Sequence, residues 1–351
     1  MVKVYIKTFG CSSNQADSEV IAGILSKKFK ITNKLNEASI VIINSCGVKL
    51  RTQNKIIGYI KNLKNKKIYV GGCLPKMLNL KKHIKVHGYF DTNSITKILN
   101  LIEKNQDILS DKKENRINLP VVRTKQHRAI INISQGCQGN CSYCSVKLAR
   151  GNLKSYKKEE IIKTIKKALK EKCNLIYLSS QDNGCYGLDI NTNLPSLLKD
   201  VIKIKGEFKI KIGMINPNYA KLYLKDLIKI YKSEKIMKIL HIPLQSGSNK
   251  LLKEMNRKYK IEDFIKITNT FRKNIPNMNI LTDIITGYPT ETKKDFQKTL
   301  NLIKKINPEV INISKFTSRP KTKASKLKQL PSQIIKERSL KLTKEIKKIK
   351  S

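Results

Sequence analysis

The chain of 351 residues is long enough for roughly two domains, and its 40% hydrophobic content excludes global disorder. Lysine and arginine total 72 against 26 aspartate and glutamate, a net charge of +46 that indicates a polyanionic partner such as nucleic acid, although an AT-rich genome would also enrich lysine. No apolar run approaches the roughly 18 residues of a membrane span, and the start, Met1 to Ile6, reads as a strand, so we expect a soluble cytoplasmic protein without membrane contacts.

The amino-terminal segment, residues 1–106, alternates predicted strands and helices. Strands are predicted at 3–7, 39–44 and 67–70, and helices at 14–28 and 52–64. Such alternation is typical of a parallel α/β sheet covered by helices. Each strand leads to a cysteine, namely Cys11, Cys46 and Cys73, and ligands bind at the carboxyl ends of strands in such sheets. We therefore expect the three cysteines to converge at one edge of the sheet.

Residues 107–125 are polar and lack periodicity, which predicts a linker, and the strand–helix pattern resumes in residues 126–320. Six strands are predicted there, at 130–134, 175–179, 208–214, 236–242, 279–285 and 310–314. Helical segments separate them, for example 158–172 and 295–305, and each strand ends in a polar or glycine-containing motif. Six such cycles predict a partial (β/α)6 barrel with its active site at the carboxyl rim. Residues 321–351 are predicted to form a basic helical tail.

The most specific motif is the C-x3-C-x2-C triad of Cys137, Cys141 and Cys144, directly after the first barrel strand. Three thiolates on one tight loop can hold three irons of a cubane and leave the fourth iron open. Zinc is the alternative, but a closed structural zinc site needs four ligands, and His127 precedes the strand. Of the remaining cysteines, Cys173 is predicted to pack in the interior, and Cys185 lies in a rim loop without an assigned role.

The triad on a six-strand partial barrel resembles the radical S-adenosylmethionine (SAM) superfamily. The resemblance implies a 4Fe-4S cluster at Cys137, Cys141 and Cys144, whose open iron binds the amino and carboxylate groups of SAM. One electron from this cluster then cleaves SAM to a 5′-deoxyadenosyl radical. Four residues at strand ends are candidates for orienting SAM, with a loop-capping hydrogen bond as the alternative for each: Ser180, Asn216, Gln245 and Asp283. Arg150 is expected either to neutralise charge on the cluster or SAM, or to be an ordinary surface arginine.

A narrower resemblance is carried by Gly10-Cys11, Asn44-Ser45-Cys46 and Gly71-Gly72-Cys73, which are similar to the amino-terminal domain of the methylthiotransferase family. Later loops match as well: Ser179 to Asp182, His241 to Ser248 and Asp283 to Glu291. The resemblance implies a second 4Fe-4S cluster on Cys11, Cys46 and Cys73, which carries or activates the inserted sulfur. One SAM would methylate that sulfur, and a second would yield the radical that takes hydrogen from carbon 2 of adenine. The implied reductant is an electron donor such as a ferredoxin or flavodoxin.

Within this family, Ile131 to Cys137 and Ser155-Tyr156 most resemble the archaeal and eukaryotic branch, which converts N6-threonylcarbamoyladenosine next to the anticodon of tRNA to its 2-methylthio derivative. Three alternatives stay open: isopentenyladenosine in tRNA, an aspartate of a ribosomal protein, and a zinc-stabilised RNA-binding protein without catalysis. Tyr186 and Tyr219 are candidates for stacking on the target base.

The carboxyl-terminal segment departs from the family pattern. Members usually end in a small RNA-binding β-barrel after an Arg-Pro-Gly-Thr segment, whereas here Lys321 follows Arg319 and Pro320, and one helix completes the sequence. We expect that barrel to be absent. Basic surface, or a separate small RNA-binding protein, is then expected to dock the tRNA.

Overall fold

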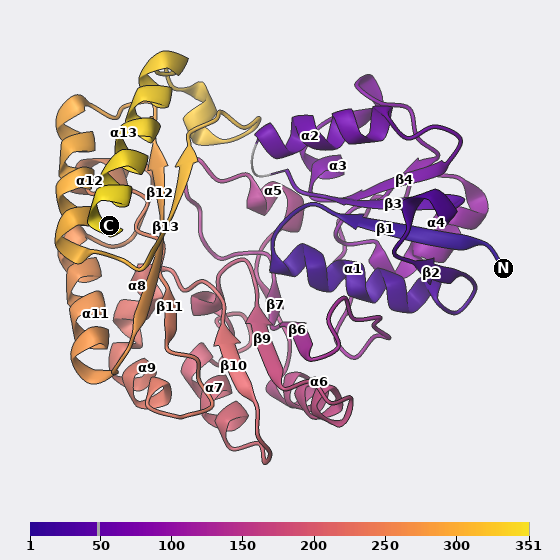
Figure 1. The fold of residues 1–351 in the computed structure, drawn as a ribbon, viewed down its shortest axis with the longest axis horizontal. Coiled ribbons are helices and arrows are strands. Elements are labelled where there is room, and N and C mark those ends of the chain that lie inside the picture. Colours follow the sequence, from indigo (N-terminus) through magenta and orange to yellow (C-terminus); the bar gives the residue numbers. More distant parts are fainter. Residues whose placement is uncertain (48–49, 351) are drawn as a thin grey trace. The chain divides into compact units, whose positions relative to one another are not determined.

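The structure is a computed structural model that describes residues 1–47 and 50–350 of the chain (Figure 1). Its internal contacts define two compact units. The first consists of residues 1–137 and 145–181, and the second consists of residues 138–144 and the chain from residue 182 onward. No helix of the described residues is both long and apolar enough to cross a membrane.

The first unit begins with a five-stranded parallel sheet in the order β2-β1-β3-β4-β5. Its strands are β1 (Lys3–Thr8), β2 (Lys30–Thr32), β3 (Ile40–Ser45), β4 (Lys67–Gly72) and β5 (Gly88–Tyr89). Its helices are α1 (Ser12–Leu25), α2 (Leu50–Lys61), α3 (Leu74–Met77) and α4 (Ile98–Lys104). The predicted alternation of strands and helices is confirmed, and the short elements β2, β5, α3 and α4 are additional to the prediction.

The central strand β3 explains why this sheet is covered on both faces. All six of its residues are buried. Ile40 and Ile42 pack in a cluster with residues of α1 and α4, whereas Val41 and Ile43 pack in another cluster with residues of α2. Figure 1 shows α1 and α2 on opposite sides of the sheet. A continuous apolar run therefore forms this strand, because alternate residues enter separate hydrophobic layers.

The first unit continues with β6 (Arg128–Asn132), β7 (Ser134–Gln135), α5 (Val146–Arg150), β8 (Lys154–Ser155), α6 (Lys158–Lys170) and β9 (Leu175–Ser179). Strands β6 and β9 pair in parallel, and β7 and β8 pair antiparallel.

Helix α1, which covers the five-stranded sheet, also contacts residues 107–125 and the end of β9, so contacts cross the predicted boundary at residue 126. Residues 107–125, all described, form no helix or named strand, and two of their side chains bind α1. The Arg116 guanidinium donates to Asp17, and Thr124 donates to Glu19, both at 2.7 Å. The Ser12 hydroxyl also lies 2.8 Å from the Ser179 hydroxyl at the end of β9. The division into compact units thus differs from the predicted domain boundaries, which stay predictions.

The second unit contains a parallel sheet in the order β11-β12-β13 and the helices that accompany it (Figure 1, right-hand end of the colour bar). Its strands are β10 (Lys209–Ile212), β11 (Ile239–His241), β12 (Asn279–Thr286) and β13 (Val310–Lys315). Its helices are α7 (Leu194–Ile202), α8 (Pro217–Leu222), α9 (Leu224–Tyr231), α10 (Asn249–Glu254), α11 (Ile261–Asn274), α12 (Lys293–Ile306) and α13 (Ser332–Lys350).

The six predicted barrel strands all have counterparts, and the largest difference is at β11. This strand covers three residues instead of the predicted 236–242, because a tight turn between the Ile239 amide and the Met237 carbonyl at 2.7 Å precedes it. The predicted tail helix is α13, which packs on β13 and α12. Arg338 of α13 binds the buried Glu291 at 2.7 Å, and this ion pair fixes the helix to the loop after β12.

Candidate active site

Three cysteines follow the carboxyl ends of β1, β3 and β4, as the sequence predicts for a parallel sheet. Cys11 precedes α1, Cys46 follows β3 directly, and Cys73 follows β4 directly. The register pairs Thr8 with Asn44 and Ser45 with Gly72, so the three strands end at the same level. Cys11 is exposed, Cys46 is half-buried and Cys73 is buried.

A chain of hydrogen bonds connects the three cysteine loops. The Cys11 thiol donates to Asn14 Oδ1 at 3.4 Å, and Asn14 Nδ2 donates to the Ser45 carbonyl at 3.0 Å. The same Ser45 carbonyl accepts the Cys73 N–H at 2.9 Å. Asn14 and Asn44 bind each other as well, through Nδ2 and Oδ1 at 3.1 Å. The loops are therefore held to one another at one edge of the sheet.

Gly72 makes this close approach of β3 and β4 sterically acceptable. Its φ is +90°, in the region that favours glycine, and a Cβ there would lie 2.4 Å from both Asn44 Oδ1 and the Ser45 carbonyl. The glycine before Cys73 is thus required both by the backbone conformation and by the hydrogen-bonded neighbours.

A buried ion network lies beside two of these cysteines. Asp17 accepts from Arg116 at 2.7 Å and from Arg150 at 2.8 Å, and each of the three side chains is no more than 5% exposed. Arg150 also donates to Asn14 Oδ1 at 3.2 Å. Burial raises the pKa of the Cys73 thiol, and the Arg150 guanidinium acts in the opposite direction. The pKa of Arg150 is itself raised, because attraction to Asp17, Cys73 and Cys11 outweighs the effect of burial.

Arg150 was a candidate for neutralising charge at the radical SAM cluster or SAM. The structure places it in the first unit with Asp17, Cys11 and Cys73 as its neighbours, and it is not a surface side chain. The donor set therefore fits an iron–sulfur cluster at Cys11, Cys46 and Cys73. Three thiols come from adjacent loops, and a buried cation is in place to offset the charge of the Cys11 and Cys73 thiolates.

The C-x3-C-x2-C motif contributes one cysteine to the first unit and two to the second. Cys137 is half-buried, and its N–H donates to the Gly151 carbonyl at 3.3 Å. In the second unit Cys141 and Cys144 lie on one turn, where the Cys144 N–H donates to the Cys141 carbonyl at 3.1 Å.

Ser142, between these two cysteines, anchors the turn to the carboxyl-terminal end of α10. Its N–H donates to the Met255 carbonyl at 3.1 Å, and its hydroxyl donates to the Glu254 carbonyl at 2.7 Å. Its own carbonyl accepts the Ala324 N–H at 2.8 Å. Two half-buried thiols on a loop fixed in this way are suitable ligands for a cubane.

Three of the four candidates for orienting SAM follow a strand, as predicted: Ser180 directly follows β9, and Asn216 and Gln245 lie in the loops after β10 and β11. The prediction is wrong for Asp283, which lies within β12, because this strand pairs with β13 as far as Thr286. Ser180 belongs to the first unit, whereas the other three belong to the second unit. Asn216 Oδ1 accepts from Arg257 at 3.1 Å, and this arginine also binds Cys141. Gln245 has a φ of +70°, a conformation that a non-glycine residue adopts at some cost and that is common at functional sites.

Asp283 is the centre of a hydrogen-bonded trio on the three neighbouring strands. Its carboxylate lies 2.8 Å from His241 Nε2 on β11 and accepts from Asn312 on β13 at 2.9 Å. Its backbone carbonyl accepts the Gln245 N–H at 2.7 Å. Asp283 and Gln245 are thus brought together.

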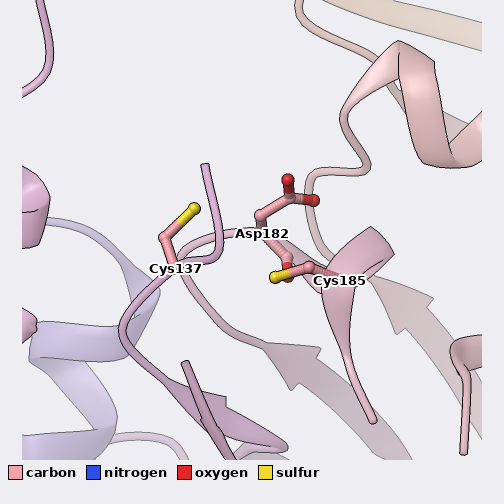
Figure 2. Close-up of side chains that lie close together, drawn as sticks. All are labelled: Cys137, Asp182 and Cys185. Atoms are coloured by element: carbon pink, nitrogen blue, oxygen red, sulfur yellow. The ribbon is translucent and has the colours of Figure 1, made fainter. Parts of the chain in front are cut away.

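One acidic and one basic side chain of the second unit, Asp182 and Arg257, were given no individual role from the sequence, although Asp182 ends one of the loops that match the family. Figure 2 shows Asp182 and Cys185 on one turn, where the Cys185 thiol donates to the Asp182 carbonyl at 3.2 Å. Burial raises the pKa of Asp182 to about 6, although the N–H groups of Asn216 and Gly184 donate to its carboxylate. Arg257 is the other residue, and its only signal in the sequence is the polar segment that follows a short helix.

Three further expectations concern single side chains. Cys173 is buried, and its thiol donates to the Gln126 carbonyl at 3.1 Å. Tyr186 is completely buried, so in this structure its ring offers no face to a base. Tyr219 is half-buried and lies against Gly184.

Comparisons with known proteins agree with this arrangement. The sequence-family model of the radical SAM superfamily matches residues 131–303, and the sequence-family model of the uncharacterized protein family UPF0004 matches residues 3–92. The solved structure of the radical S-adenosylmethionine methyltransferase TsrM from Kitasatospora setae is similar with a TM-score of 0.66 and 11% identity, and covers 93% of this chain and 75% of that one. The fold is thus that of the radical SAM enzymes, an α/β architecture with a partial barrel.

Curated relatives are similar over nearly the whole chain. The "Probable threonylcarbamoyladenosine tRNA methylthiotransferase" of Pyrococcus horikoshii is 41% identical over 350 residues, which cover 97% of this chain and 82% of the relative. The human threonylcarbamoyladenosine tRNA methylthiotransferase is 35% identical, over 97% of this chain and 62% of its own length. The chain therefore belongs to the family of radical SAM methylthiotransferases, within its threonylcarbamoyladenosine tRNA branch.

Proposed function

We propose that the chain is a tRNA methylthiotransferase that converts N6-threonylcarbamoyladenosine next to the anticodon to its 2-methylthio derivative. The names of its relatives, threonylcarbamoyladenosine tRNA methylthiotransferases, support this substrate. Within the structure, the strongest support is the hydrogen-bond chain through Asn14 and Ser45, which connects the loops of Cys11, Cys46 and Cys73. Three thiols joined in this way favour a second cluster in addition to the one that the superfamily implies.

In this proposal Cys137, Cys141 and Cys144 hold the cluster that binds SAM, and Cys11, Cys46 and Cys73 hold the auxiliary cluster. Once bound, these groups supply the one-electron cleavage of SAM and the sulfur that is transferred. Arg150 offsets negative charge at Cys11 and Cys73, and Asp17 holds the guanidinium in place. Asn216, Ser180, Gln245 and Asp283 orient SAM at the rim.

The proposal assigns residues 1–106 to auxiliary cluster binding, 126–320 to the radical SAM barrel and 321–351 to a basic tail, with 107–125 as the connection. A ferredoxin or flavodoxin supplies the electron. Lysine-rich surface, or a small RNA-binding protein, contacts the tRNA phosphates, since phosphate contacts depend on cationic side chains. The place of action is the cytoplasm.

Nucleoside analysis of tRNA tests this function. A strain without the gene is complemented with the wild type, with Cys46→Ser or with Cys173→Ser, which replaces a buried cysteine outside both sets. The wild type and Cys173→Ser are expected to restore 2-methylthio-N6-threonylcarbamoyladenosine, whereas Cys46→Ser is expected to leave the unmodified precursor. Methylthiolation that appears on isopentenyladenosine, or on a ribosomal protein aspartate, contradicts the proposed substrate. Full restoration by Cys46→Ser contradicts the second cluster.

A further inference from the structure

The guanidinium of Arg257 joins a cysteine of the radical SAM motif to the predicted SAM rim. Nη1 donates to the Cys141 sulfur at 3.3 Å. Nη2 donates to Asn216 Oδ1 at 3.1 Å and to the Pro243 carbonyl at 3.2 Å. All four residues belong to the second unit. One planar cation thus contacts a thiol, a side-chain amide and the loop after β11.

The neighbours of Arg257 fix its orientation. The guanidinium carbon lies 5.0 Å from the ring centroid of Tyr259, a cation–π contact, and Nε donates to the Tyr259 oxygen at 3.3 Å. The Tyr259 hydroxyl donates to the Leu244 carbonyl at 2.5 Å, so the ring itself is held by the same loop. The Arg257 N–H donates to the Leu252 carbonyl at 2.8 Å, which fixes the backbone. The cation is therefore pre-oriented toward Cys141.

We propose that Arg257 is a positioning residue that raises the reduction potential of the SAM-cleaving cluster through its hydrogen bond to Cys141. The inference rests on the proposed role of Cys141 as a cluster ligand. When the cluster takes up one electron from its donor, no bond is broken and one negative charge is added. An arginine stays charged at all relevant pH values, so it stabilises the reduced state more than the oxidised state. Hydrogen bonds to cluster sulfurs and nearby charge are known determinants of such potentials.

The same contacts suggest why the positive charge of Arg257 lies next to Cys141. Asn216 shares the guanidinium with the thiol, and Asn216 is a candidate for orienting SAM. Arg257 thereby links Asn216, at the rim where SAM would bind, to Cys141, the cluster ligand through which it raises the reduction potential. A lysine keeps the charge but has no planar fork for three acceptors at once.

A potentiometric titration monitored by electron paramagnetic resonance tests the proposal. The background is Cys11→Ser, Cys46→Ser and Cys73→Ser, so that only the cluster at Cys137, Cys141 and Cys144 is observed, with dithionite as reductant. Arg257→Gln is expected to disfavour reduction at least tenfold, which corresponds to a midpoint potential about 59 mV more negative. Arg257→Lys is expected to lie between this variant and the background protein. Arg272→Gln is the matched control, since Arg272 binds Glu309 and two backbone carbonyls and no cysteine.

Each result is decisive. A full iron content in Arg257→Gln with an unchanged potential overturns the proposal and leaves the proposed function intact. If Arg257→Gln fails to retain iron, the lysine variant decides: retained iron and a near-normal potential support a role for the charge, whereas loss of iron in both variants shows a structural role alone and overturns it. A background protein without an iron–sulfur signal contradicts the assignment of Cys141, and with it the proposed function.

Discussion

Two buried arginines share the buried carboxylate of Asp17, and replacing this residue by asparagine gives a specific prediction. Asp17→Asn keeps the shape of the side chain and removes the charge. Arg116 and Arg150, which bind it at 2.7 and 2.8 Å, are then left as two buried cations without their counter-ion. An asparagine Oδ1 can still accept from one of them, so some hydrogen bonding is kept.

The magnitude follows from the burial of all three side chains. Two unit charges about 4 Å apart attract by about 4 kcal/mol at an effective dielectric constant near 20. Breaking one partner of a buried ion pair costs about 3–5 kcal/mol in measured cases. We expect Asp17→Asn to lower the free energy of unfolding by about 3 kcal/mol, because the amide replaces part of the interaction. With a urea m-value of about 2 kcal/mol/M, the unfolding midpoint of the first unit falls by about 1.5 M.

The assay is urea unfolding of the metal-free protein at pH 7, followed by circular dichroism. Asp111→Asn is the control, since Asp111 also binds a lysine, Lys76, but its side chain is fully exposed. The control is expected to leave the midpoint unchanged, because exposed pairs contribute little. If Asp17→Asn behaves like this control, the network does not stabilise the unit, and the electrostatic account of the auxiliary site is wrong.

Three further predictions concern pH, backbone and salt. Burial raises the pKa of Asp182 from its ordinary 3.8 to about 6, so ionisation of this carboxyl lowers the free energy of unfolding as the pH rises from 4 to 6. In metal-free protein, Asp182→Asn is expected to remove this pH dependence and to raise the free energy of unfolding at pH 7 by roughly 3 kcal/mol. A steeper pH dependence of the variant in urea unfolding contradicts the prediction. Gly72→Ala is expected to lower the urea midpoint strongly, whereas Gly58→Ala, on α2 with open space around it, is expected to raise stability by about 0.5–1 kcal/mol; equal effects contradict the steric argument. Filter binding of tRNA is expected to weaken steeply with added salt, and a salt-insensitive affinity contradicts docking on basic surface.

Much of the fold follows from patterns that act over a few residues. The apolar run from Ser39 to Asn44 predicts a strand buried on both faces, and β3 is such a strand. The positions of Cys11, Cys46 and Cys73 after strands predict their convergence, because parallel strands in register end at one edge. Local periodicity thus suffices to predict an element that is long and lies in a uniform environment.

The partners of the charged residues could not be predicted in this way. Arg150 binds Asp17 across 133 positions, and Arg257 binds Cys141 across 116. In a sequence with so many cations, neither arginine differs from those on the surface, and only the folded chain brings them to a carboxylate or a thiol. Tyr186 illustrates the same limit, since a tyrosine in a rim loop reads as a stacking platform but is completely buried.

The central claim is that the chain binds two iron–sulfur clusters on two separate sets of cysteines, and metal analysis of anaerobically reconstituted protein tests it most directly. The wild type and Cys173→Ser are expected to contain about eight iron and eight sulfide per chain, as two cubanes require. Replacing Cys11, Cys46 and Cys73 together, or Cys137, Cys141 and Cys144 together, is expected to remove about four of each. Zinc in place of iron, or a full iron content in either triple variant, contradicts the account.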